Sequence, residues 1–222
     1  MNLRPLFALM AIGIGSPAAL AESESQLWTS AEVRYRPVKP VRIYLTQHLR
    51  LDQHMSHLDA AISELTASWA ALDWLRLGGG YRYNLEKTKN DVFRPEHRLH
   101  IQSSFQHDVG PVELSYRLRY QHGIEMDDPI ETTRKIRQEI QAEFDTDTDF
   151  TPALSAELFH ELFEASPTEK EKVDLTASLE VQASKSHAIE VFYRLRTPIA
   201  DVTDPVEHIL GLGYQLRLRR KR

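Results

Sequence analysis

Cysteine is absent from this chain of 222 residues, and long hydrophobic runs are scarce. Without cysteine the protein forms no disulfide and offers no thiol nucleophile. Beyond the first residues, no stretch approaches the ~18 consecutive apolar residues of a membrane helix. Basic tracts are short as well, and the formal net charge of -5 gives no indication of nucleic-acid binding. Any membrane span in this chain must therefore be built from strands.

Residues 1–21 have the features of a secretory signal peptide. A single positive charge, Arg4, precedes an apolar run from Leu6 to Ile14, and a small-residue cleavage site ends at Ala21. The apolar run is too short to span a bilayer. We therefore expect cleavage after Ala21 and a mature domain of residues 22–222. This length suits a single all-β domain.

Two segments between residues 94 and 121 show the pattern that recurs along the mature chain. Apolar and polar residues alternate in each, so that Leu114 and Leu118 share one face while Arg117 and Arg119 share the other. Successive side chains of a strand point to opposite faces of the sheet. The alternation therefore predicts a hairpin with one apolar face and one strongly charged face.

About eleven segments of this kind divide the mature chain. They cover residues 27–36, 41–51, 57–72, 74–83, 94–107, 112–121, 134–144, 154–162, 173–183, 189–197 and 208–219. The third also fits a helical stripe, and the Gly78-Gly79-Gly80 run in the fourth is better explained as a barrel kink than as a phosphate loop. Short turns alternate with longer connections, which is typical of outer-membrane barrels. We expect an antiparallel up-and-down transmembrane β-barrel with an even strand number, ten or twelve.

Alternation alone also fits a soluble ligand-binding barrel of the periplasm, with its apolar face turned inward. Three features favour the membrane. Arginine and glutamate crowd the polar face, tryptophan and tyrosine lie near segment ends, and the composition is too polar for a large conventional core. One feature opposes it, because the chain ends in Arg222 rather than in the aromatic residue that terminates many outer-membrane barrels.

Several motifs resemble a family of Gram-negative outer-membrane β-barrels grouped as domain of unknown function 2490. They are LWTSAEVRYRP, LRLGGGYRYN, FRPEHRLHIQ, LSYRLRYQ, TPALSAELFHEL, HAIEVFYRLR and HILGLGYQLRL, in this order along the mature chain. The resemblance implies a barrel in the cell outer membrane and implies no reaction. It further implies contact with outer-membrane lipid, and delivery by periplasmic chaperones and the barrel-assembly machinery.

The charged face predicts a lumen lined by charged side chains. The candidate lining residues are Arg82, Arg98, Arg117, Arg119, Glu139, Glu143, Glu157, Glu180, Arg194, Arg196 and Arg217. Because the last strand of a barrel neighbours the first, the arginines should form one arc that faces an acidic arc. Either the arcs pair and fill the lumen, or they create a transverse field in a narrow channel for small polar solutes. The small lumen of ~10–12 strands favours the filled state.

No catalytic constellation stands out, and we expect neither an enzyme nor a cofactor. An outer-membrane hydrolase acting on lipid or peptide would need serine, histidine and an acid in contact. The nearest match is His54, Ser56 and His57, with Asp52 and Asp59 alongside. Metal binding is not expected on the histidines of the hairpin either, since those at positions 97 and 100 point to opposite faces.

Overall fold

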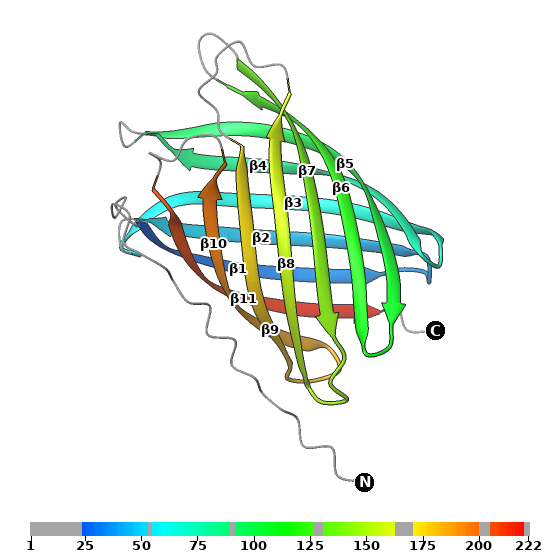
Figure 1. Ribbon diagram of the computed structural model, residues 1–222. Helices are drawn as coiled ribbons and strands as arrows, with labels where there is room; N and C mark the ends of the chain where they lie inside the picture. The colour runs from blue at the N-terminus through cyan, green and yellow to red at the C-terminus, as the bar shows by residue number, and fades with distance from the viewer. Residues whose placement is uncertain are drawn as a thin grey trace.

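A computed structural model describes residues 24–52, 55–88, 92–126, 131–162, 171–199 and 205–219. In these residues the chain forms a closed barrel of eleven strands (Figure 1). The strands are β1 (Glu24–Arg36), β2 (Val41–Asp52), β3 (His57–Leu72), β4 (Leu75–Lys87), β5 (Phe93–Val109), β6 (Val112–Glu125), β7 (Glu131–Phe144), β8 (Phe150–Glu161), β9 (Lys172–Gln182), β10 (His187–Pro198) and β11 (Glu207–Arg219). The predicted signal peptide lies outside the described residues.

The barrel closes through one parallel pair of strands. Every other neighbouring pair is antiparallel, whereas β1 and β11 run in the same direction, in register from Glu24 opposite Glu207 to Arg36 opposite Arg219. An all-antiparallel barrel needs an even number of strands, and a single parallel seam permits an odd one. This seam is why the structure has eleven strands where ten or twelve were expected.

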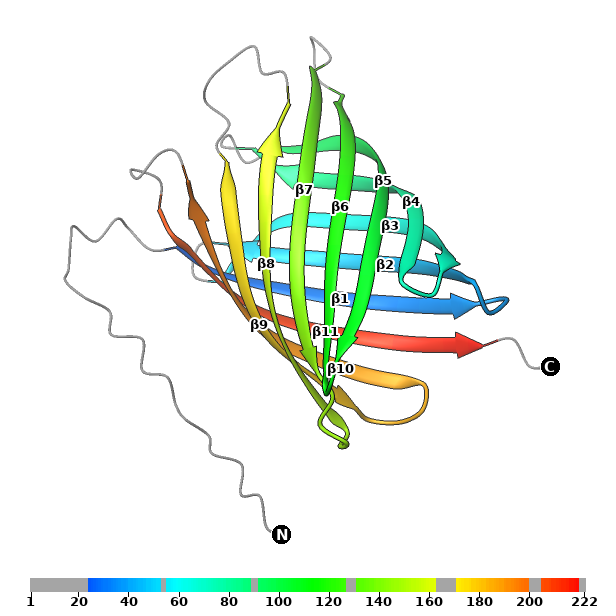
Figure 2. The same ribbon diagram turned by 45° about the vertical axis from the view of Figure 1, so that its right-hand side comes forward.

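The two ends of the barrel differ. At the short-turn end, the strands are joined by residues 37–40, 73–74, 110–111, 145–149 and 183–186. The remaining connections belong to the long-loop end. Gly110 has a φ of 60°, a conformation that glycine adopts without steric cost, in the turn between β5 and β6. Because β1 and β11 are parallel, Glu24 lies at the long-loop end and Arg219 at the short-turn end (Figure 2).

The barrel is apolar outside and polar inside. Among the most exposed side chains are Ile101 and Leu99, at 66% and 58%, whereas Glu64 and Asp174 are 8% and 1% exposed. The leucines that test the direction of the apolar face, at positions 114, 118, 175 and 179, are all exposed. The structure therefore contradicts the alternative of a soluble barrel with its leucines turned inward.

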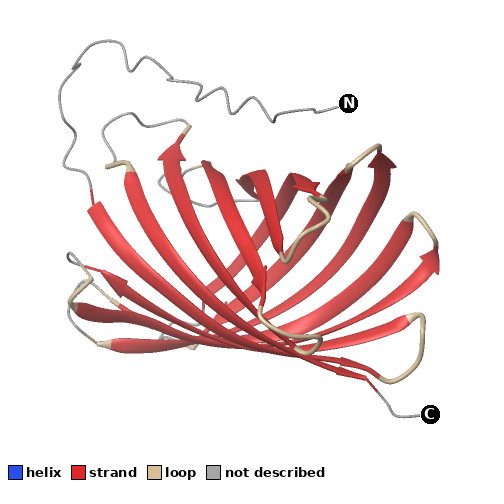
Figure 3. Ribbon diagram, turned by 90° about the horizontal axis from the view of Figure 1, so that it is seen from below, coloured by secondary structure: helices blue, strands red, loops and turns tan. Residues whose placement is uncertain are grey.

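The segment with two competing patterns, residues 57–72, is a strand of the wall, β3. Its inner face begins with two apolar residues, Ala60 and Ile62, and continues with Glu64, Thr66 and Ser68, all of them buried. The change from apolar to polar residues along one face produced the apparent helical stripe. Figure 3 shows strands and loops throughout, and no helix in the described ranges is long and apolar enough to cross a membrane.

Candidate functional site: the charged lumen

The inner face of β3–β6 carries a buried network around Glu64. The Nε of Arg82 donates a hydrogen bond to Glu64 Oε2 at 2.6 Å, and Arg119 reaches the same carboxylate from β6 at 3.6 Å. His100 lies 3.8 Å from Glu64 and is 3% exposed. Since β4 and β5 lie between β3 and β6, the contact from Arg119 spans two intervening strands along the inner face. Three basic side chains thus surround one carboxylate.

A second network joins β6, β7 and β8. Glu157 accepts hydrogen bonds from Nε and Nη2 of Arg137, at 3.0 and 2.6 Å, in a two-pronged contact. Arg117 lies between Glu157, at 3.0 Å, and Glu139, at 2.5 Å. The side chain of Glu157 is 5% exposed. A buried carboxylate with two guanidinium partners is the arrangement in which charge burial costs least.

A third network closes the lumen on the side of β9–β11. Asp174 is 1% exposed, and both its oxygens accept hydrogen bonds from Arg196, at 2.7 and 2.9 Å. Arg194 approaches the same carboxylate at 3.4 Å. Arg196 also lies 3.4 Å from Glu207 on β11. Asp174 therefore neutralises part of a cluster of arginines, just as Glu64 does on the opposite wall.

An aromatic side chain, Trp28 of β1, points into the lumen and is 9% exposed. Its ring lies beneath the guanidinium groups of Arg50, Arg196 and Arg194, at 3.9, 5.0 and 5.2 Å from the ring centre. Cations at this distance over an indole ring are attracted by its electron-rich face. Beside it, the ring of Phe192 covers Gly211, where a Cβ atom would lie 2.0 Å from the phenyl ring. Rings and arginine stems together fill this level.

The remaining predicted residues lie in smaller pairs. Arg98 binds Glu96 at 2.6 Å, two residues away on β5. Arg217 lies 2.5 Å from Glu180, across the intervening strand β10. Glu143 makes no ion pair with any residue that the structure describes. The predicted lining residues thus divide into three networks, two local pairs and one exposed carboxylate.

Sequence reasoning missed several partners of these charges. Glu96 comes from a segment expected to supply arginines, Glu64 from the segment with two competing patterns, Glu207 from just before the last segment, and Arg137 from a segment expected to be acidic. In the middle of the lumen the two signs are therefore mixed rather than separated into facing arcs. The alternation of Glu64 with Leu65 would have placed Glu64 on the inner face, had the strand pattern of this segment been preferred to the helical one.

Polar side chains on the outer wall bind one another. Tyr81 lies 2.6 Å from His97, and Tyr193 and Tyr214 make equally short contacts with the histidines at positions 208 and 187. Two further pairs of polar side chains on the outer wall also form hydrogen bonds. Ser63 donates to Gln47 at 2.6 Å, and Tyr116 donates to Gln138 at 3.0 Å. Each of these outward groups therefore has at least one hydrogen-bond partner on the neighbouring strand.

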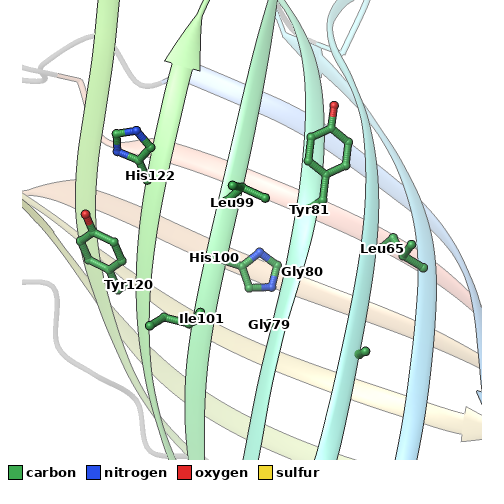
Figure 4. A pocket seen from close by; sticks show the side chains of 10 residues that line it. Leu65, Gly79, Gly80, Tyr81, Leu99, His100, Ile101, Tyr120 and His122 are labelled. Carbon is green, nitrogen blue, oxygen red and sulfur yellow. The ribbon is translucent and has the colours of Figure 1, made fainter.

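An apolar groove of about 590 Å³ lies on the outer wall across β3–β6 (Figure 4). It opens where Gly79 stands beside the larger side chains of the neighbouring strands. The other lining residues are Leu65, Ala67, Gly80, Tyr81, Leu99, His100, Ile101, Tyr120 and His122. His100 points inward, and its ring lies close behind Gly80, where a Cβ atom would be 2.6 Å from Cε1. The glycines therefore thin the wall at this point.

The hydrolase candidate is incomplete in the part of the chain that the structure describes. Ser56 and His57 lie 2.8 Å apart, through Oγ and Nδ1, at the exposed start of β3. No described acid contacts the ring of His57 from its other side, and His54 lies outside the described residues. His97 is half-buried while His100 is fully buried, and no described group of three or more acidic or histidine side chains could hold a metal ion.

A family model described as a protein of unknown function, DUF2490, matches residues 25–198. The chain belongs to the DUF2490 family. The matched region begins in β1 and ends with β10, so it covers all three charge networks except the contribution of β11. No curated protein matches the chain. Membership of this family supports the barrel and carries no assigned reaction.

Proposed function

We propose that this DUF2490 protein is an integral outer-membrane β-barrel with a closed, charge-filled lumen and a structural rather than a catalytic role. One observation carries the proposal: the apolar face of every strand points outward, while carboxylates such as Glu64 and Asp174 are buried inside. In water this arrangement would expose an apolar surface far larger than soluble monomers tolerate. In a bilayer the same apolar surface contacts lipid tails, and the cost of exposing it to water does not arise.

The paired polar groups on the outer wall support a lipid environment. A hydrogen-bonding group without a partner costs several kcal/mol in hydrocarbon. Gln47, Ser63, Tyr116 and Gln138 would each pay this penalty if they were unpaired, and each has a partner on the neighbouring strand. Such pairing has no comparable advantage on a surface that water solvates.

The buried networks support a lumen that does not conduct. A water-filled channel leaves its lining charges accessible to solvent, whereas Glu157 and Asp174 have side chains that are 5% and 1% exposed. Trp28 and Phe192 block the same level with aromatic rings. For this reason we prefer the structural role to that of a narrow channel.

The predicted signal peptide and the family resemblance favour the outer membrane over other membranes. Short turns of such barrels face the periplasm and longer loops face outward. On this basis the short-turn end would be periplasmic. Periplasmic chaperones and the barrel-assembly machinery would be the partners during biogenesis, and outer-membrane lipid the permanent one.

Planar-bilayer conductance of the refolded mature chain tests the proposal. We expect a heat-modifiable barrel that inserts without discrete current steps. The double variant Trp28→Ala/Phe192→Ala removes two rings from the lumen and should produce discrete current steps. These steps would show that the barrel inserts into the bilayer under the conditions of the assay. Discrete steps from the unchanged chain would refute the closed lumen. Failure to form a heat-modifiable barrel in detergent or lipid would refute the membrane assignment.

A further inference from the structure

Five arginines lie on one side of the lumen at its short-turn end. We call Arg34, Arg36, Arg42, Arg76 and Arg219 the arginine arc. They come from four strands, β1, β2, β4 and β11, and occupy the inward positions nearest the turns. The parallel seam places Arg36 directly beside Arg219. None of the five belongs to the networks that close the middle of the lumen.

Three members of the arc converge on one region. The guanidinium of Arg34 lies 5.1 Å above the ring of Tyr44, which is two residues from Arg42 on the same face. The Nη1 of Arg76 lies 3.5 Å from the hydroxyl of Ser68. Ser68 is the direct neighbour of Arg42 across the β2–β3 ladder. Three positive groups from three strands therefore face the space around Tyr44 and Ser68.

The charge of the arc is largely uncompensated. Of the carboxylates that the structure describes, only Glu32 pairs with it, 3.2 Å from Arg34. Arg42 and Arg76 have no described carboxylate within ion-pair distance, unlike the arginines in the middle of the lumen. In addition, the Nε atoms of Arg34 and Arg76 are buried without a hydrogen-bond partner. Donors of this kind are costly to leave unpaired, so each calls for a partner.

The opposite side of the same mouth is acidic. Glu113 and Glu143 face each other on β6 and β7, and Glu180, which pairs with Arg217, follows on β9. The separation of charge predicted for the whole lumen is therefore found at this end alone. The resulting field draws anions towards the arginines and cations towards the glutamates.

We propose that the arginine arc binds a phosphate-bearing anion that enters from the short-turn end. Guanidinium groups offer planar pairs of donors that match phosphate oxygens, and the unpaired Nε atoms supply such donors here. The partly exposed side chain of Arg34, at 31%, leaves the site accessible from the mouth. Beyond it the lumen is filled around Trp28, so the anion binds at a dead end. The inference goes beyond the proposed function and does not depend on a bilayer.

Calorimetric titration of inorganic pyrophosphate into the mature chain, refolded in zwitterionic micelles, tests the site. We expect saturable binding that weakens at least about tenfold in Arg42→Gln/Arg76→Gln, because two charge-assisted contacts are lost. Neither arginine has a described carboxylate partner, so both changes should preserve folding, which heat modifiability checks. If the double variant does not fold, Arg42→Gln alone should weaken binding in the same direction. Lys185→Gln removes an exposed charge in a turn at the same end and should leave the affinity unchanged.

Three results would overturn the proposal. These are the absence of saturable binding to the unchanged chain, equal weakening by the variant at Lys185, and equal displacement by chloride at the same ionic strength. A second titration in micelles doped with phosphatidylglycerol identifies the source of the phosphate. Competition by the lipid would assign the site to a headgroup, and unchanged binding would assign it to a soluble anion. Either result retains the arginine arc as a phosphate site.

Discussion

Arginine in place of Ile101 should destabilise the folded barrel strongly if the outer wall contacts lipid. Ile101 is the middle residue of β5 and is 66% exposed. An arginine at the bilayer midplane of a membrane barrel costs about 2–4 kcal/mol. On a surface in contact with water, a substitution at so exposed a position changes stability by less than about 0.5 kcal/mol. The two environments therefore predict clearly different results.

Val109 provides the matched control on the same face of the same strand. It is the last residue of β5 and is 52% exposed. Eight residues at about 3.4 Å each place it ~27 Å from Ile101 along the strand. With a strand tilt of ~40°, this is roughly 20 Å along the membrane normal, beyond half of an apolar band ~25 Å tall. Val109→Arg should therefore cost less than about 1 kcal/mol.

Urea-dependent folding into phospholipid vesicles, followed by heat-modifiable migration on gels, gives both free energies of unfolding. We expect Ile101→Arg to lower the free energy of unfolding by at least about 2 kcal/mol more than Val109→Arg. Equal and small effects of the two substitutions would refute the reasoning. Equal and large effects would do so as well, because depth in the membrane would then be irrelevant.

Two further pairs of substitutions test the ion networks and the wall packing with the same assay. Glu157→Gln leaves the buried Arg137 without its carboxylate and should cost about 3–5 kcal/mol, whereas Glu113→Gln at the short-turn end should cost less than about 1 kcal/mol; equal costs would contradict the buried network. Gly80→Ala brings a Cβ atom to 2.5 Å from a backbone oxygen and should cost about 1–3 kcal/mol. Gly79→Ala, whose added Cβ atom would lie 3.1 Å from the nearest backbone oxygen, should cost less than Gly80→Ala, and a reversed order would contradict the packing described.

The strands were predictable because alternation is a local property of the sequence. All eleven segments correspond to strands, including residues 57–72, whose inner face starts with Ala60 and Ile62. The sense of the closing pair was not predictable. Alternation gives the face of each residue but no information on the direction in which two strands far apart in sequence meet. The strand number followed from that missing information.

The charged face was likewise predictable and its pairing was not. Arg119 of β6 reaches Glu64 of β3 past two intervening strands, a contact that depends on the tilt and stagger of the strands rather than on spacing in the sequence. The same stagger places Arg137 beside Glu157. Trp28 gave no signal as a lumen residue, because tryptophans near the ends of such strands usually mark the membrane interface.

Quenching of tryptophan fluorescence by brominated lipids tests the central claim most directly. The chain has three tryptophans. Trp69 on the outer wall and Trp74 in the turn after β3, stacked on the outward Phe105, are each 52% exposed, whereas Trp28 is 9% exposed in the lumen. In vesicles of brominated lipid we expect strong quenching of the unchanged protein. The variant Trp69→Phe/Trp74→Phe, which retains Trp28 alone, should lose most of that quenching. Quenching of Trp28 as strong as that of the outer pair, or no quenching of the unchanged protein, would contradict a lipid-facing wall around a closed lumen.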